Sequence, residues 1–209
     1  DSDGVNSAYI LGDAISYAIY YMNSDSHLEI KLPERSEGYG LNMEFCAVVV
    51  WYNPDENSIK NIEKYKNFCS KVYIVDNSTK NNFALTKTID NCVYIPNLKN
   101  LGIAKALNIG CQKAKDQGEL WCMTMDQDSS WDNDALKLFI SKARELMSSK
   151  NVSFSPNHKN QIHSVIGGLK FNREDNKKEV KNIDKVISSG NLINLDIWEK
   201  VGKFNTDLF

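Results

Sequence analysis

The stretch Leu120-Trp121-Cys122-Met123-Thr124-Met125-Asp126-Gln127-Asp128-Ser129-Ser130-Trp131 runs from apolar residues into two carboxylates separated by one residue. We predict that its apolar part is a buried strand that presents Asp126 and Asp128 at its carboxyl end. In an open α/β sheet, ligands bind outside the carboxyl ends of the strands. Alternate residues of an extended segment share a face, so both carboxylates are expected to point at the same spot.

Two carboxylates at one spot suit a hard divalent cation, Mg²⁺ or Mn²⁺, which also holds substrate phosphates. A D-x-D pattern alone has a second explanation. It also fits a polar strand-to-helix loop in which Asp128 or Ser129 caps a helix that begins near Asn133. The segments upstream of this stretch bear on the choice.

Composition narrows the possible partners and compartments. The 209 residues carry a net charge of -2 with no basic patch, so nucleic acid is not expected as a partner. No apolar run is long enough for a membrane span, and the acidic start at Asp1-Ser2-Asp3 does not resemble a signal peptide. The five cysteines lie apart and the three histidines lack metal-ligand spacing. This usage predicts a cytoplasmic protein with reduced cysteines and no zinc site.

The chain divides at about Met43. Residues 1–42 carry one amphipathic pattern, which predicts a helix from Leu11 to Met22, and are interpreted as an N-terminal extension or fused segment. Residues 43–209 carry alternating strand and helix patterns and are interpreted as one domain. No internal repeat is visible.

From Met43 onward, apolar runs of strand length alternate with helical patterns. The predicted strands are Phe45–Trp51, Lys71–Val75, Cys92–Ile95 and Trp121–Met125, with helices over 56–69, 82–90, 102–117 and 132–147. Such alternation implies right-handed crossovers. The fold class is therefore α/β, with a mostly parallel sheet flanked by helices.

Four strand ends then meet along one edge of the predicted sheet. They occur in the segments VVVWYNP (48–54), IVDNS (74–78), NLGIAKALNIG (100–110) and MDQDSSW (125–131), and a fifth segment, SSGNLINLDIWEKVGKFNTDLF (188–209), follows. In this order and spacing they resemble family 2 glycosyltransferases of the GT-A fold, the nucleotide-diphospho-sugar transferase fold. The sequences of these segments are most similar to those of bacterial rhamnosyltransferases of cell-surface polysaccharide synthesis. The resemblance covers Glu44 to the end of the chain.

The resemblance implies a donor-nucleotide site. Tyr52 and Asn53 match the position where the family packs the base, and an aromatic face suits stacking. Asp76 would accept a hydrogen bond from the base imide, which favours uracil or thymine, although an Asx turn explains the same residue. Asn100 and Lys105 match the stretch beside the nucleotide and its diphosphate. Lys105 could equally be a solvent-exposed lysine on the predicted helix, without a ligand.

The resemblance also implies a metal site and a sugar pocket. Asp126 would contact the ribose or the cation, and Asp128 would be the main protein ligand of Mg²⁺ or Mn²⁺. Gly190 and Asn191 match the floor near the acceptor and sugar, where a residue without Cβ permits close approach. A strand bulge explains Gly190 equally well. Trp131 and Trp198 are expected in the core rather than as a sugar platform.

One departure from the family concerns catalysis. Inverting transfer needs a general base, which the family places shortly after its D-x-L-F element. Asp207 matches the position before L-F, not the base, and Phe209 is the last residue. We therefore expect the general base beyond Phe209, a chain incomplete at its C-terminus, and little or no turnover by this fragment alone.

The function expected from these features is inverting transfer of a sugar, rhamnose from dTDP-rhamnose being favoured over other dTDP- or UDP-linked donors. The acceptor would be a saccharide or a lipid-linked saccharide, reached from the cytoplasm or from the inner face of the membrane. A nucleotidyltransferase and a non-catalytic nucleotide-binding module are the alternatives. A nucleotidyltransferase is disfavoured because this sequence has no Gly-rich loop with a basic residue after its first predicted strand. A Rossmann dehydrogenase is disfavoured because no G-x-G-x-x-G follows a strand.

Overall fold

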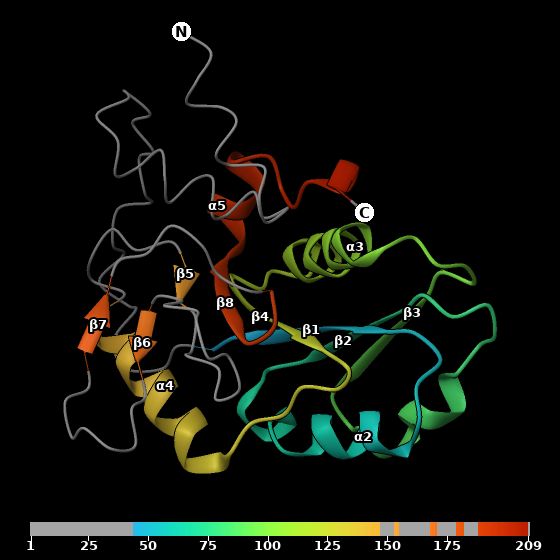
Figure 1. The fold of residues 1–209 in the computed structure, drawn as a ribbon, viewed down its shortest axis with the longest axis horizontal. Coiled ribbons are helices and arrows are strands. Elements are labelled where there is room, and N and C mark those ends of the chain that lie inside the picture. Colours follow the sequence, from blue (N-terminus) through green and yellow to red (C-terminus); the bar gives the residue numbers. More distant parts are fainter. Residues whose placement is uncertain (1–43, 147–152, 155–167, 171–178, 182–187, 209) are drawn as a thin grey trace, which may run out of the picture.

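The computed structural model describes residues 44–146, 153–154, 168–170, 179–181 and 188–208. The predicted extension over residues 1–42, with its helix, lies outside these ranges. Strands and helices alternate from Cys46 onward, as the sequence predicts (Figure 1). The described part of the chain contains no helix that is long and apolar enough to cross a bilayer.

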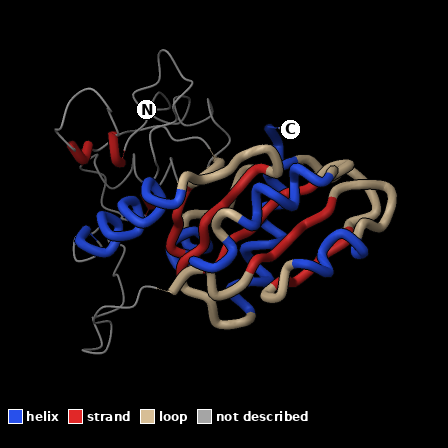
Figure 2. The backbone as a smooth tube through the Cα atoms, turned by 90° about the horizontal axis from the view of Figure 1, so that it is seen from below, coloured by secondary structure: helices blue, strands red, loops and turns tan. Residues whose placement is uncertain are grey.

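Within the described residues, the main sheet has six strands in the order β3-β2-β1-β4-β8-β5. Their bounds are β1 Cys46–Trp51, β2 Val72–Asp76, β3 Cys92–Pro96, β4 Trp121–Asp126, β5 Ser153–Phe154 and β8 Asn191–Asn194. The first four strands are parallel to one another, whereas β8 runs antiparallel to both β4 and β5. Figure 2 shows the strands side by side. A separate antiparallel pair joins β6 (Gly168–Lys170) to β7 (Glu179–Lys181).

Helices cover both faces of the sheet. The α-helices are α2 Glu56–Glu63, α3 Ile103–Asp116, α4 Asn133–Leu146 and α5 Leu195–Lys200. The helix predicted over 56–69 ends early, and a 3-10 turn, Lys66–Phe68, follows it. The helix predicted over 82–90 is a 3-10 helix, Phe83–Thr88. A third 3-10 turn is Thr206–Leu208.

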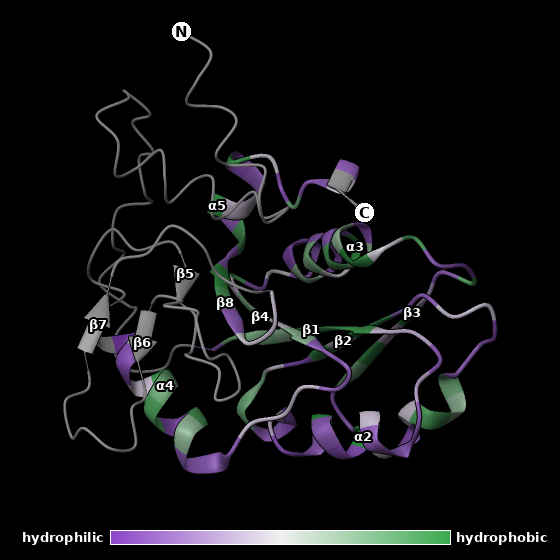
Figure 3. Cartoon of the chain, viewed as in Figure 1, coloured by the Kyte–Doolittle hydropathy of each residue, from purple (hydrophilic) through white to green (hydrophobic). Residues whose placement is uncertain are grey.

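The core has two halves because successive β1 side chains point to opposite faces. Val49 and Trp51 pack with residues of α2 and α4, whereas Val48 and Val50 pack with residues of α3 and α5. All four side chains are at most 8% exposed. In Figure 3 the central strands are mostly hydrophobic and the outer side of α2 is hydrophilic. This burial on both faces explains why β1 is continuously apolar rather than alternating.

The antiparallel direction of β8 brings the Ser188-Ser189-Gly190 block to the carboxyl end of β4. Asn191 is in register with Thr124, and the Gly190 backbone N–H donates to the Thr124 carbonyl at 2.7 Å. Gly190 has φ +77°, a conformation that favours glycine. The glycine is therefore explained by a left-handed turn at the start of the strand.

Helix α3 also holds the segment after β8. The Asn108 side chain donates to the Phe204 carbonyl at 2.8 Å and accepts from the Phe204 N–H at 2.9 Å. One turn later, Gln112 accepts from Lys203 Nζ at 2.7 Å. Lys115 forms ion pairs with Asp196 and Glu199 of α5. These three α3 side chains are spaced along one side of the helix.

Gly110 marks the closest approach of α3 to the sheet. A Cβ built there would lie 2.4 Å from Val48 Cγ1 and 2.9 Å from Val75 Cγ2. These valines belong to β1 and β2, so the absent side chain sets the distance between helix and sheet.

Gly110→Ala is expected to lower the free energy of unfolding by about 1–2 kcal/mol. Overpacking costs about 1–3 kcal/mol, and the helix-propensity gain of about 0.5–1 kcal/mol offsets only part of it. Urea denaturation measures the change, with Lys113→Ala on the exposed side of α3 as the control. The control should change stability by less than about 0.5 kcal/mol. A Gly110→Ala variant as stable as the parent would contradict close packing.

Candidate functional site

The loops that leave β1, β2 and β3 are joined by backbone hydrogen bonds at the carboxyl edge of the sheet. The Asn77 N–H donates to the Trp51 carbonyl at 2.8 Å, and the Asn97 N–H donates to the Asp76 carbonyl at 2.8 Å. The loops therefore continue the strand pairing one residue past each strand. This edge carries the predicted residues Tyr52, Asp76, Asn100 and Asp126, and the turn at Gly190 joins it through β4.

Asp126 and Asp128 lie on a tight turn rather than on an extended segment. The Ser129 N–H donates to the Asp126 carbonyl at 3.2 Å, so Gln127 and Asp128 occupy the middle of the turn. The expectation that alternate residues of a strand present the two carboxylates together is therefore wrong in its geometry. The carboxylates still interact, because burial raises the pKa of Asp126 and the negative charge of Asp128 raises it further.

Asp132 caps the helix that follows. Its Oδ1 accepts from the N–H groups of Asp134 and Ala135, both at 3.1 Å, at the start of α4. The reading in which Asp128 or Ser129 is the cap is therefore wrong. Asp128 has an exposed side chain. Within the described residues its carboxylate has no hydrogen bond or ion pair.

The turn fits a divalent cation in its donor chemistry. Asp126 is partly buried, and within the described residues its carboxylate also has no hydrogen bond or ion pair. Two carboxylates that repel each other suit a bound cation, which would lower the pKa of Asp126. No group of three or more His, Cys, Asp or Glu side chains able to hold a metal occurs in the described ranges. The remaining ligands would therefore be phosphate oxygens and water, as is usual for Mg²⁺.

Tyr52 and Asn53 form the exit from β1. The Tyr52 side chain is 49% exposed, an unusual state for a large aromatic residue beside a core. Its backbone N–H donates to Gln127 Oε1 at 2.7 Å, and its carbonyl accepts from Gln127 Nε2 at 3.2 Å. Asn53 has φ +49° and donates its N–H to Ser78 Oγ at 2.7 Å. The backbone is thus fixed at both residues while the Tyr52 ring remains available.

Asp76 is 1% exposed and its carboxylate accepts several internal hydrogen bonds. Oδ1 accepts from the Ser78 N–H at 2.9 Å, which is the Asx turn considered as an alternative from the sequence. Oδ2 accepts from Asn82 Nδ2 at 2.8 Å and from the Tyr94 hydroxyl at 2.6 Å. Burial raises the pKa of Asp76, but these hydrogen bonds outweigh it and hold the pKa below its ordinary value.

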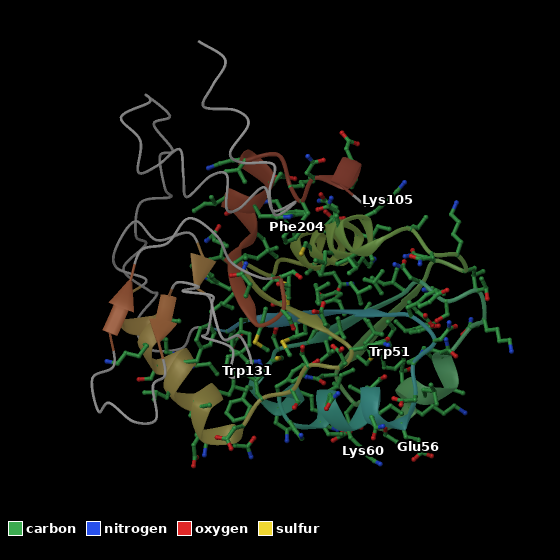
Figure 4. The ribbon with its side chains drawn as sticks, viewed as in Figure 1. Trp51, Glu56, Lys60, Lys105, Trp131 and Phe204 are labelled. Atoms are coloured by element: carbon green, nitrogen blue, oxygen red, sulfur yellow. The ribbon has the colours of Figure 1, made fainter. Side chains whose placement is uncertain are left out.

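Asparagine amides organise the start of α3. Asn77, which is 2% exposed, donates to the Gly102 carbonyl at 3.1 Å and accepts from Asn97 Nδ2 at 2.8 Å. Asn100 Oδ1 accepts from the Gly102 N–H at 2.9 Å, where Gly102 has φ +79°. Lys105 is exposed on the first turn of α3 (Figure 4). No ion pair engages Lys105 within the described residues, so its charge is available to a ligand.

The turn before β8 contacts the end of β4. Ser189, 3% exposed, accepts the Asp126 N–H on its Oγ at 3.1 Å. The Thr124 hydroxyl donates to the Ser188 carbonyl and lies 3.2 Å from the Asn191 carbonyl. Gly190 and Asn191 are buried, with Asn191 fully so. The structure thus places Gly190 and Asn191 beside Thr124 of β4, while Ser189 contacts the backbone of Asp126.

The tryptophans considered as a sugar platform belong to the core. Trp198 is 0% exposed and Trp131 is 9% exposed. Trp131 packs against Phe139 with ring centroids 5.1 Å apart, on the α4 side of the sheet (Figure 4). Neither ring therefore presents a flat face to a ligand.

The chain is similar to known proteins over most of its length. A family model described as "Glycosyl transferase family 2" matches residues 51–197, well over half of the chain. The chain belongs to glycosyl transferase family 2. The family expected from the five sequence segments is thereby confirmed.

The similar proteins include a curated transferase and a solved structure. The chain is 28% identical over 184 residues to the dTDP-rhamnosyl transferase RfbF of Shigella flexneri, a match that covers 81% of this chain and 60% of RfbF. The crystal structure of S. aureus TarS 1-349 superposes with a TM-score of 0.56 at 15% identity, covering 76% of this chain and 49% of TarS 1-349. That fragment also has a crystal structure in complex with UDP-GlcNAc, with a TM-score of 0.52. The GT-A-like fold is thereby confirmed, and the chain spans only part of both relatives.

The predictions from the sequence missed Gln127, Tyr94 and Ser189. Gln127 is the variable position of D-x-D, where only the turn geometry reveals a role. Tyr94 was identifiable in principle, because parallel register places it two residues before the partner of Asp76, on the same face. The role of Ser189 could not be predicted, because β8 was not expected to run antiparallel beside β4.

Tyr94→Phe removes the hydrogen bond that the Tyr94 hydroxyl donates to Asp76 and the one that it accepts from the Asn82 N–H at 2.8 Å; only the first depends on the charge of Asp76. At pH 7 the variant should lose about 1.5–3 kcal/mol of unfolding free energy, the usual range for a hydrogen bond to a charged group. Because the pKa of Asp76 is depressed in the folded state, this contribution is present above its ordinary pKa of 3.8 and is lost as the pH falls below it. Urea denaturation from pH 7 to pH 3 measures the change.

Tyr73→Phe is the matched control for this experiment. The Tyr73 hydroxyl donates to Gln117 Oε1 at 2.8 Å, a neutral acceptor. Its loss should cost about 0.5–1.5 kcal/mol, without the dependence on acid expected for Tyr94→Phe. Equal and pH-independent losses in the two variants would show that Asp76 is not the partner that matters.

Proposed function

We propose that this glycosyltransferase moves rhamnose from dTDP-rhamnose, or a related sugar from a dTDP- or UDP-linked donor, to a saccharide acceptor in cell-surface polysaccharide synthesis. The reaction would invert the anomeric centre and depend on Mg²⁺ or Mn²⁺. The 28% sequence identity to the dTDP-rhamnosyl transferase RfbF supports this choice of donor. The observation that carries the proposal is the turn at the end of β4, whose two carboxylates are left for a ligand while the exposed Tyr52 lies on the adjoining loop.

In this proposal the nucleoside lies along the exits of β1 and β2. The Tyr52 ring stacks on the base, and the Asn53 backbone, fixed by Ser78, sets the path of the loop. Asp76 accepts the imide N–H of uracil or thymine. A carboxylate has about four acceptor positions, three of which already have donors. The Ser78 side chain also hydrogen-bonds to the carboxylate, and Asp76 is 1% exposed, so the base would have to displace the Asn82 amide.

The diphosphate would lie between α3 and the β4 turn. Lys105 neutralises phosphate charge from the first turn of α3, and Asn100 orders the loop that leads into that helix. Asp128, with Asp126, holds the divalent cation. When bound, the cation supplies Lewis acidity that stabilises the departing nucleoside diphosphate. Gly190 and Asn191 form the floor for the sugar and acceptor, beside the carboxyl end of β4.

The acceptor hydroxyl needs a general base, which no described residue supplies with clear geometry. The alternatives kept from the sequence, a nucleotidyltransferase and a binding module without catalysis, make different predictions for the product. Family membership favours glycosyl transfer over both.

Titration calorimetry of dTDP and UDP, each with Mn²⁺ or with EDTA, tests the donor site. We expect binding that depends on the cation and prefers dTDP. Asp128→Asn should weaken binding in Mn²⁺ at least tenfold, about 1.4 kcal/mol, and should leave binding in EDTA unchanged. Asp134→Asn, an exposed carboxylate on α4, is the control and should behave like the parent. A folded chain that binds neither nucleotide contradicts the proposal.

Asp128→Asn also has an expected effect on stability without metal. Because the pKa of Asp126 is raised in the folded protein, its ionisation opposes folding at pH values above its ordinary range. Removal of the Asp128 charge relieves part of this cost. The melting temperature in EDTA should therefore rise slightly at pH 7, and the difference should vanish near pH 3. A marked fall in the melting temperature would indicate a structural role for Asp128.

A further inference from the structure

Gln127 makes an unusual pair of contacts for a residue in the middle of a turn. Its side-chain amide accepts from the Tyr52 N–H at 2.7 Å and donates to the Tyr52 carbonyl at 3.2 Å. Both backbone groups of one residue are thus satisfied by one side chain, 75 positions away in the sequence. We call this pair of bonds the Gln127 clamp.

The turn that carries Gln127 is itself held by α2 and by β8. Asn61 Nδ2 donates to the Gln127 carbonyl at 3.0 Å, and Lys64 Nζ lies 3.4 Å from Ser130 Oγ. On the other side, Ser189 accepts the Asp126 N–H. The turn is therefore held in place on two sides. Through the Gln127 clamp it also holds the backbone of Tyr52, in the loop after β1.

The two ends of the clamp carry different chemistry. On one side, Gln127 lies between Asp126 and Asp128, the carboxylates assigned to the cation. On the other side, Tyr52 has a backbone fixed by the clamp and a ring that is about half exposed. Glutamine suits this role because the amide supplies one donor and one acceptor. Glutamate lacks the donor and would add a third negative charge.

We propose that Gln127 is a positioning residue that fixes the distance between the base-stacking ring of Tyr52 and the cation-binding carboxylates, so that one nucleoside diphosphate engages both at once. This inference rests on the proposed function. A ligand that spans two sites gains affinity when the sites are held at the right spacing, because less ordering is required on binding. Ligands that occupy only one of the sites do not gain.

The test compares a spanning ligand with its parts. Gln127→Met keeps the side-chain length and removes both hydrogen bonds. In Mn²⁺, its affinity for dTDP should fall about tenfold. Its affinity for Mn²⁺-pyrophosphate, by calorimetry, and for thymidine, by saturation-transfer NMR, should change less than about threefold. A loss confined to the ligand that spans both sites is a readout that general damage to the fold does not produce.

Two further variants support the comparison. Gln127→Ala removes the same bonds with a smaller side chain and should give the same pattern if methionine does not fit the turn. Gln112→Met is the matched control. Gln112 lies on α3, on the opposite face of the sheet from α2, and its side chain accepts a hydrogen bond from Lys203. Its dTDP affinity should equal that of the parent.

The outcomes separate this inference from the proposed function. If the parent binds dTDP and both Gln127 variants bind it equally well, the inference is overturned and the donor site stands. If dTDP, pyrophosphate and thymidine all lose affinity together, the residue supports the fold of the site and does not set a spacing. If the folded parent binds no dTDP, the proposed function fails, and the inference fails with it.

Discussion

The parallel pairing of β1 with both β2 and β4 is the constraint on which the site depends. Parallel strands bring every carboxyl end to one edge, so residues as distant in the chain as Trp51, Asp76 and Asp126 end their strands together. The register is fixed because β1 is buried on both faces, and a shift of one residue would exchange its two sets of apolar side chains. The close contact of Gly110 with Val48 and Val75 fixes the height of α3 above these same strands. The polar edge is thus positioned by apolar packing beneath it.

Neutral amides do most of the positioning at this edge. Asn61, Asn77 and Gln127 each donate from a side-chain amide to the backbone of another segment of the edge. Asn82 donates to Asp76 at the end of β2, within its own segment. An amide can both donate and accept, and it does not titrate. Loops are therefore joined without adding charge next to Asp126 and Asp128. The electrostatics of the proposed site are then set by these carboxylates, by Lys105 and by the ligand.

The sequence was sufficient for the central strands and for the residues at their ends. Continuous β-branched runs, ended by Asn, Asp or Pro, identify buried parallel strands and the edge where they stop. The direction of β8 was not predictable, because an apolar run does not specify parallel or antiparallel pairing. The turn at Asp126 was also missed. The prediction assumed an extended backbone through Asp128, whereas the hydrogen bond from the Ser129 N–H to the Asp126 carbonyl closes a turn there. The cap at Asp132 is a local contact, but several polar residues before α4 could have made it, and the sequence does not distinguish among them. The Tyr94 bond to Asp76 follows from the parallel register of β2 and β3.

The late position of β8 in the chain has a consequence for how the molecule is assembled during synthesis. Its partners at Thr124 lie 64 to 67 residues earlier, and Phe204 meets Asn108 across 96 residues. Contacts of such long sequence separation form after local ones, because the intervening loop must first close. The four parallel strands, by contrast, are all available once β4 has left the ribosome. The edge built from the exits of β1 to β4 is therefore expected to form before the turn that precedes β8, so that a nascent chain completes this edge from its N-terminal side first.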